Sequence, residues 1–170
     1  MKKFLSLILA LALSLSLVAC GGSDDKKDDA AQAEAPDLQA FFDKYMADMA
    51  AELGEENSPA MMEMEEVGLD AFYPGLKDVA TKQMVAQAAM ISAVAFEFVL
   101  VEVENPADVE TVQNIFQTRI TTQVEGGAFY PATVAAWEEA QVITNGNVVA
   151  LIVAADVQAQ AVEAFNALFA

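Results

Sequence analysis

The stretch at residues 94–104, Val-Ala-Phe-Glu-Phe-Val-Leu-Val-Glu-Val-Glu, constrains the fold more than any other part of this chain. β-Branched and aromatic residues dominate it, which is typical of a β-strand. Apolar side chains occupy both of its faces at first, and a strand that is apolar on both faces lies inside a sheet rather than at its edge. We therefore expect a central strand here.

A second β signal lies near the C-terminus. Residues 141–144 and 147–154 are two β-rich runs around Asn145-Gly146. Asn-Gly between such runs favours a type I′ hairpin, because both central residues of that turn need a positive φ. We expect a hairpin with Asn145 and Gly146 at its tip.

Helical periodicity surrounds these strands. Apolar residues recur at three- and four-residue spacing in four segments, which predicts amphipathic helices at about residues 38–53, 108–125, 132–140 and 156–169. Residues 61–69 fit a short helical or extended piece, and residues 76–89 are expected to begin as a helix. The sequence therefore predicts a two-layer α+β domain with a helical N-terminal portion. Its sheet would have about three antiparallel strands, the long central strand and the hairpin, packed by helices.

The N-terminal segment predicts export and lipid attachment. Lys2 and Lys3 precede an apolar run at residues 4–18, and Ala19 and the only cysteine, Cys20, follow it. A positive start, a short apolar run and small residues before a cut describe a secretory signal peptide. The run is shorter than the roughly 20 apolar residues that cross a membrane. We expect Cys20 to carry acyl chains, with no disulfide in the domain.

The segment after Cys20 differs in composition from everything that follows. Residues 21–36 contain no aromatic and no large aliphatic residue, so they cannot bury a core. As a flexible coil they would span roughly 20 to 25 Å. We expect a signal peptide at residues 1–19, a lipid-anchored, disordered acidic tether at 20–36 and a single α+β domain at 37–170. The protein would then sit at the cell membrane, on its extracytoplasmic face.

The charge of the chain excludes some partners. Its formal net charge is −18, and Arg119 is the only Lys or Arg after Gln83. Nucleic acids and anionic lipid headgroups attract clustered Lys and Arg, and would repel this domain. The acidity favours solubility, with weak, diffuse binding of divalent cations as the alternative. The expected partners are the membrane, through acyl chains on Cys20, and an envelope protein or small ligand, but no nucleic acid.

The residue types also exclude much of enzyme chemistry. Histidine is absent and the only cysteine is assigned to the anchor, so Ser-His-Asp and Cys-His arrangements and the usual zinc sites are excluded. Thioethers bind Cu(I), but core filling explains methionines on a helix better. The methionines in question are Met46, Met49, Met61, Met62 and Met64. We expect no enzyme activity, no cofactor and no metal site.

Glu97 stands out because it interrupts the apolar strand between two phenylalanines. A buried charge without a partner costs several kcal/mol, so Glu97 needs a cation, and Arg119 is the available one. We expect an ion pair that is structural or faces a ligand; a carboxylate with a raised pKa acting as acid or base is the alternative. Tyr73 and Tyr130, each followed by proline, are candidates for lining a groove.

Several segments together resemble a known family. They are the Cys20 motif, the acidic tether, Tyr73-Pro74-Gly75-Leu76, Met90-Ile91-Ser92-Ala93 before Glu97, Arg119, Tyr130-Pro131 and Asn145-Gly146-Asn147. Over roughly residues 61–169 the chain resembles a domain-of-unknown-function family of lipoproteins from Gram-positive bacteria. The resemblance implies an exported, lipid-anchored domain, and it implies no catalytic residues.

These observations predict a non-enzymatic module, anchored by lipid at the cell surface, that binds a ligand or interacts with a protein. The apolar strand and the two Tyr-Pro loops are the expected contact surface. Two alternatives stay open. One is a small carboxylate-dependent enzyme that uses Glu97 or loop carboxylates, and the other is a structural component of the envelope or of a spore.

Overall fold

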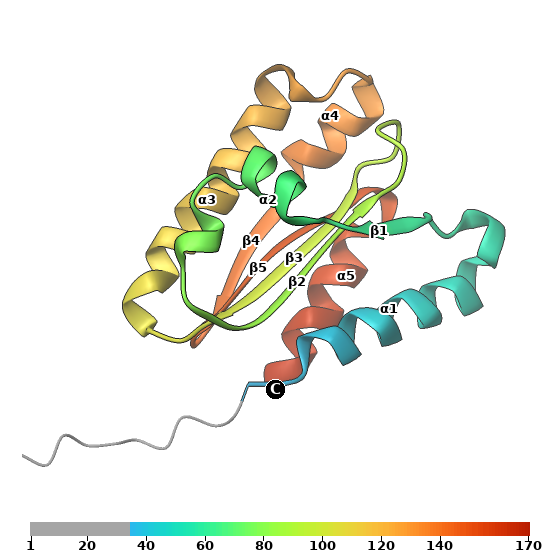
Figure 1. The fold of residues 1–170 in the computed structure, drawn as a ribbon. Coiled ribbons are helices and arrows are strands. Elements are labelled where there is room, and N and C mark those ends of the chain that lie inside the picture. The colour runs from blue at the N-terminus through green and yellow to red at the C-terminus, as the bar shows by residue number, and fades with distance from the viewer. Residues whose placement is uncertain (1–34) are drawn as a thin grey trace, which may run out of the picture. The chain divides into compact units, whose positions relative to one another are not determined.

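A computed structural model describes residues 35–170 (Figure 1). The expectations for the signal peptide, for lipid attachment at Cys20 and for the tether up to residue 34 lie outside the described residues. Residues 35–170 belong to one compact unit, built on an antiparallel sheet of five strands in the order β1-β2-β3-β5-β4. The strands are β1 (Met61–Glu63), β2 (Thr81–Ala89), β3 (Phe96–Val103), β4 (Gln141–Asn145) and β5 (Val148–Ala154).

Helices cover both faces of the sheet. They are α1 (Leu38–Leu53), α2 (Glu66–Phe72), α3 (Val109–Thr122), α4 (Pro131–Glu138) and α5 (Gln158–Asn166). Figure 1 shows α2, α3 and α4 on one face and α1 and α5 on the other. The α+β class is confirmed, and the molecule has three layers.

The helix boundaries follow local chemistry. The Asp37 carboxylate accepts the Ala40 N–H at 2.9 Å and so caps the start of α1, and Gly54, with φ 90°, follows its last residue. Such a φ favours glycine because a Cβ is crowded there. α4 begins at Pro131, whose fixed φ suits a first helical position.

The prediction of two layers and about three strands is wrong, and burial explains why. Every residue of β3 and of β5 is buried, so each face of these strands needs a cover of helices. In β3, Phe96, Phe98 and Leu100 pack toward α1 and α5. Its Val99, Val101 and Val103 pack in a second core on the other face.

The two strands that the prediction missed have weak β signals. β2 reads Thr-Lys-Gln-Met-Val-Ala-Gln-Ala-Ala, and Lys, Ala and Gln have low preference for strands. It forms a strand because it pairs along β3 from Thr81 opposite Val103 to Ala88 opposite Glu97. β1 has only three residues and pairs with the end of β2. Pairing with neighbouring strands, rather than local preference, therefore explains why β1 and β2 are extended. The prediction that β3 is central is confirmed.

The hairpin is confirmed, but its turn lies one residue later than predicted. Asn145 pairs with Val148, so Gly146 and Asn147 are the central residues. Gly146 has φ 57°, whereas Asn147 is not among the residues with positive φ. This pattern fits a type II′ turn, which needs glycine only at its first central position.

The residues that lead into α1 lie at the end of the sheet opposite the β2–β3 loop. The Leu38 N–H donates to Gln83 Oε1 at 3.0 Å, and Gln83 Nε2 donates to the Pro36 carbonyl at 3.2 Å. Gln83 lies near the start of β2, while the β2–β3 loop begins at residue 90. At about 3.3 Å per strand residue, the entry point and the loop are roughly 20 Å apart.

Candidate functional site

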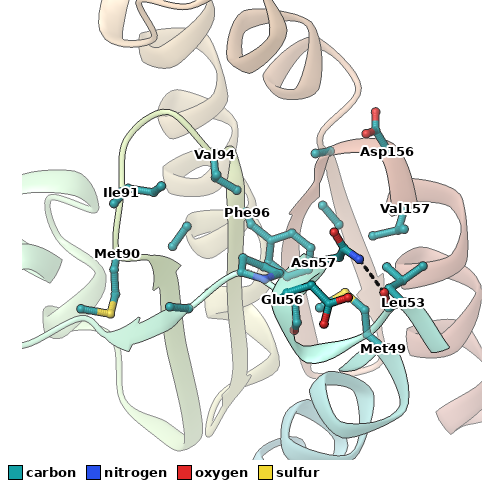
Figure 2. Close-up of a pocket in the computed structure, with 16 residues that line it drawn as sticks. Met49, Leu53, Glu56, Asn57, Met90, Ile91, Val94, Phe96, Asp156 and Val157 are labelled. Atoms are coloured by element: carbon teal, nitrogen blue, oxygen red, sulfur yellow. Dashed lines mark hydrogen bonds between the residues drawn. The ribbon is translucent and has the colours of Figure 1, made fainter. Parts of the chain in front are cut away.

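The end of the sheet at the β2–β3 loop, residues 90–95, adjoins two cavities. The first, called here the α1 cavity, has about 450 Å³ and lies between the loop, the end of α1 and residues 154–157. Figure 2 shows Met90, Ile91 and Val94 on the loop side of this cavity and Met49 and Leu53 on its α1 side.

The second, called the α3 cavity, has about 540 Å³ and lies on the other face of the sheet. Residues of β1 and α2, of the β2–β3 loop, and of the ends of α3 and α4 line it. Both volumes are in the range of small-molecule and peptide side-chain pockets, about 300 to 1,000 Å³. The two cavities share the loop residues Met90, Ile91 and Val94 as a common wall.

Glu97 and Arg119 meet at the wall of the α3 cavity. Arg119 Nε donates to Glu97 Oε1 at 3.0 Å, and Arg119 Nη2 donates to Glu97 Oε2 at 2.9 Å. The Tyr73 hydroxyl also donates to Glu97 Oε1. β3 supplies the carboxylate, α3 supplies the guanidinium, and the tyrosine directly follows α2. Two parallel N–H···O bonds from one guanidinium fix the pair in a single geometry.

Aromatic rings enclose the Arg119 guanidinium. Its Cζ lies 4.4 Å from the centre of the Phe72 ring, 5.0 Å from that of Trp137 and 5.7 Å from that of Tyr73. Stacking of this kind stabilises a cation that is withdrawn from water. The arginine is thus held by a carboxylate on one side and by ring faces around it, with little freedom to move.

The environment shifts the pKa of two of these groups. Burial raises the pKa of Tyr73 well above its ordinary value, and the charge of Glu97 raises it further. Burial by itself lowers the pKa of Arg119, but the bonds to Glu97 and its charge outweigh that effect, so the pKa of Arg119 is raised. Tyr73 is therefore a neutral hydroxyl donor, and Arg119 is a permanent cation.

The rims of the two cavities are apolar and exposed. Among residues 35–170, all the exposed large apolar side chains except Met84 and Tyr130 line one of the two cavities. Phe129 is 85% exposed, Val67 79% and Ile91 62%. These side chains therefore contribute little to the core of the domain. They gather at one end of the molecule rather than being scattered over its surface.

The exposed charges on these rims have one sign. Glu56 and Asp156 line the α1 cavity and Glu65 lines the α3 cavity, and all three are exposed. The one cation among the lining residues is Arg119, which is buried and paired with Glu97. Within residues 35–170 no group of three or more Cys, Asp or Glu side chains is placed to hold a metal ion.

The structure separates the two tyrosines that were candidates for a groove. Tyr73 is 1% exposed, so it offers no surface to a groove and acts instead as a donor to Glu97. Tyr130 is 53% exposed and precedes α4. The expectation for Tyr73 is wrong because α2 and the following turn place its ring edge-on against Phe116 in the core.

The apolar strand is not part of an exposed contact surface, and the five methionines considered above do not lie together. β3 is central and buried throughout, so it contacts only its own domain. Met49 belongs to the core on the α1 face, whereas Met64 belongs to the core on the α3 face. The five methionines therefore do not form one cluster.

Sequence reasoning missed the exposed apolar residues that define the rims. Phe129 follows Gly126 and Gly127 in a loop, and Ile91 lies in the β2–β3 hairpin loop. Large apolar residues in loops were the available signal, because loops usually lie on the surface. That signal could not show that these residues converge on one pair of cavities.

Comparison with known proteins gives one match. The profile of a family described as "Domain of unknown function (DUF4358)" matches residues 54–154. The matched segment contains the whole lining of the α3 cavity, while Met49, Leu53 and residues 155–157 of the α1 cavity lie outside it. Neither the curated proteins nor the solved structures give a significant match. Within residues 35–170, no helix has the length and hydropathy needed to span a bilayer.

Proposed function

Since the chain belongs to the DUF4358 family, whose function is unknown, its role has to be argued from its own site, and we propose that it is a lipid-anchored, extracytoplasmic binding module. In this proposal the α3 cavity receives apolar groups of a partner. The observation that carries it is the exposed apolar rim around a cavity of about 540 Å³.

The rim supports binding because exposed apolar surface is unfavourable unless a partner covers it. Monomeric proteins seldom gather large exposed apolar side chains in one place, and where they do, the patch usually marks an interaction site. Val67 on α2, Ile91 in the β2–β3 loop and Phe129 before α4 reach the α3 cavity from three different segments of the chain. Because the apolar residues come from three separate segments, the exposed rim does not arise from the conformation of a single loop.

The position of the cavities fits an anchored module. If acyl chains on Cys20 hold the protein in the membrane, the domain is attached through Pro36 and α1. That attachment lies roughly 20 Å from the β2–β3 loop, at the other end of β2. The cavities would then open at the end of the domain remote from the attachment, where a partner in the extracytoplasmic space can reach them.

The geometry of Glu97 favours binding over acid–base catalysis. A general base needs an oxygen within hydrogen-bond reach of the substrate proton. Both oxygens of Glu97 already accept bonds from Arg119, and Oε1 accepts a further bond from Tyr73. The ion pair therefore serves to position Arg119 and the surrounding rings at the wall of the cavity.

The proposal can be tested with a neutral apolar dye such as Nile red, whose fluorescence rises in an apolar site. The protein from residue 20 onward, carrying Cys20→Ala so that no lipid is attached, is titrated with the dye. The double variant Ile91→Ser/Phe129→Ser should weaken binding at least about fivefold, because it removes the rim. Both side chains are exposed, so folding should be unaffected.

The matched control is Met84→Ser, which removes an exposed apolar side chain that lines neither cavity. Its dye affinity should equal that of the unmodified chain. Equal binding by all three proteins, or no binding by the unmodified chain, would contradict a binding role for this cavity.

A further inference from the structure

The two cavities form one continuous binding surface around the β2–β3 loop. Met90, Ile91 and Val94 line both of them, and Ile91 is 62% exposed between the two openings. A ligand that covers Ile91 and enters both cavities has to bend over the loop. A polypeptide segment with apolar side chains on either side of a short spacer meets this demand better than one compact molecule.

The charge of the side chains that line the two cavities favours some polypeptides over others. The exposed charged side chains that line the two cavities, Glu56, Glu65 and Asp156, are all acidic. Arg119 offers no positive charge at the surface because it is buried and bonded to Glu97 through two nitrogens. Complementary potentials favour encounter and suppress wrong partners, so an acidic segment or an anionic lipid surface would be repelled.

We propose that this end of the domain binds a basic amphipathic polypeptide segment, with its apolar side chains in the α1 and α3 cavities and its Lys or Arg residues against Glu56, Glu65 and Asp156. The inference rests on the binding function proposed above, which it makes more specific. The partner segment would belong to another extracytoplasmic protein.

The test uses two synthetic peptides that share one set of apolar residues and differ only in the residues between them, which are Lys in one and Glu in the other. Each is labelled, and its affinity for the unlipidated chain from residue 20 with Cys20→Ala is measured by fluorescence anisotropy. The Lys peptide should bind at least about tenfold more tightly than the Glu peptide. Its affinity should fall at least about fivefold between 50 and 500 mM salt, because exposed charges are screened.

Two variants with equal net charge locate the effect. Glu56→Gln/Glu65→Gln removes two rim carboxylates, and Glu104→Gln/Glu110→Gln removes two exposed carboxylates that lie beyond the other end of β3. The first should weaken the Lys peptide about fivefold and the second less than about twofold, as charges away from the contact are screened. An equal effect of the two would show nonspecific attraction to an acidic protein and would overturn the proposal.

The remaining outcomes separate this inference from the binding function. If Nile red binding depends on Ile91 and Phe129 but neither peptide binds, the basic partner is wrong and the apolar binding site stands. If neither the dye nor the peptide depends on these residues, both proposals fail. Sedimentation that shows self-association, lost in Ile91→Ser/Phe129→Ser, would assign the surface to a second copy of the chain and overturn the basic partner.

Discussion

At the scale of single residues, Glu97 and Arg119 form a buried ion pair on the α3 face of the sheet. Removing one member of a buried ion pair leaves the other charge unpaired, which costs about 3 kcal/mol or more. We expect Glu97→Gln and Arg119→Met each to lower the free energy of unfolding by about that amount. The double variant should lose at least about 1 kcal/mol less than the sum, because the two groups act as one unit. Urea unfolding of all four proteins measures this coupling.

The exposed Lys44–Asp48 pair on α1 is the control for that cycle. Its two side chains are 74% and 65% exposed, so water solvates either charge when its partner is removed. Lys44→Met should therefore cost no more than about 1 kcal/mol. Purely additive losses at Glu97 and Arg119 would mean that the contact between them contributes nothing to stability.

Tyr73 makes a prediction for alkaline pH. Its pKa is raised above the ordinary value of 10.0, mainly by burial. Between that value and the higher pKa of the folded state, the unfolded chain has lost a proton that the folded chain keeps. The free energy of unfolding then falls as pH rises, by up to about 1.4 kcal/mol per pH unit from this group. Below pH 10 the contribution is fully present.

Tyr73→Phe keeps the ring and removes the titrating hydroxyl. At neutral pH we expect it to cost about 1.5 to 3 kcal/mol, because Glu97 loses a hydrogen bond. Urea unfolding at a series of pH values from about 8 to 10.5 should show a shallower alkaline loss in this variant. Burial also raises the pKa of Tyr45, but that group titrates in both proteins. Parallel pH curves for the two proteins would contradict a shifted Tyr73.

At the scale of elements, two glycines with different backbone conformations predict opposite effects of a methyl group. Gly146 has φ 57° at the β4–β5 turn, and no atom lies within 4 Å of an added Cβ, so Gly146→Ala should cost about 1 to 2 kcal/mol through the backbone alone. Gly68 lies inside α2, and its added Cβ would meet Met64 at 3.8 Å, an ordinary contact.

Gly68→Ala should therefore raise the free energy of unfolding by up to about 1 kcal/mol, because alanine favours a helix. Thermal or urea unfolding of the two variants beside the unmodified protein checks both signs. If Gly146→Ala proved neutral, the positive φ at the turn would be wrong.

The elements also show what local sequence cannot decide. The amphipathic patterns predicted α1, α3 and the final helix, because their apolar spacing is a property of the chain itself. β2 was missed, since its Ala and Gln residues favour a strand only when paired with β3. The helices on both faces follow from burial on both faces of β3 and β5, which the apolar sequence of β3 already contained.

At the scale of the whole molecule, the proposed anchor gives a prediction for cells. Cys20→Ser should abolish incorporation of a labelled fatty acid into the protein and remove it from the detergent phase of a Triton X-114 partition, because the serine has no thiol to modify. Ser23→Ala, three residues further along the chain, serves as control and should keep the label. Label retained in Cys20→Ser would contradict attachment at this cysteine.

Composition alone was enough to predict which partners and which enzyme chemistry to exclude. The relevant features are the acidic charge, the absence of histidine and the single cysteine. The partner of Glu97 could also be inferred, because a buried carboxylate needs a cation and Arg119 is the only Lys or Arg after Gln83. The third member, Tyr73, could not, since its hydroxyl reaches Glu97 only after α2 has packed on the sheet. Hydrogen bonds between distant segments depend on where elements meet.

The sequence by itself thus determined the helices with strong apolar periodicity, the central strand, the hairpin and the Glu97–Arg119 pairing, because each follows from local preference or from the cost of an unpaired charge. Only the tertiary structure decided the five-strand order, the third layer and the two cavities. Those features depend on which segments converge at the β2–β3 loop. Exposed Ile91 and Phe129 are ordinary loop residues in the sequence, and they become a candidate binding surface only through that convergence.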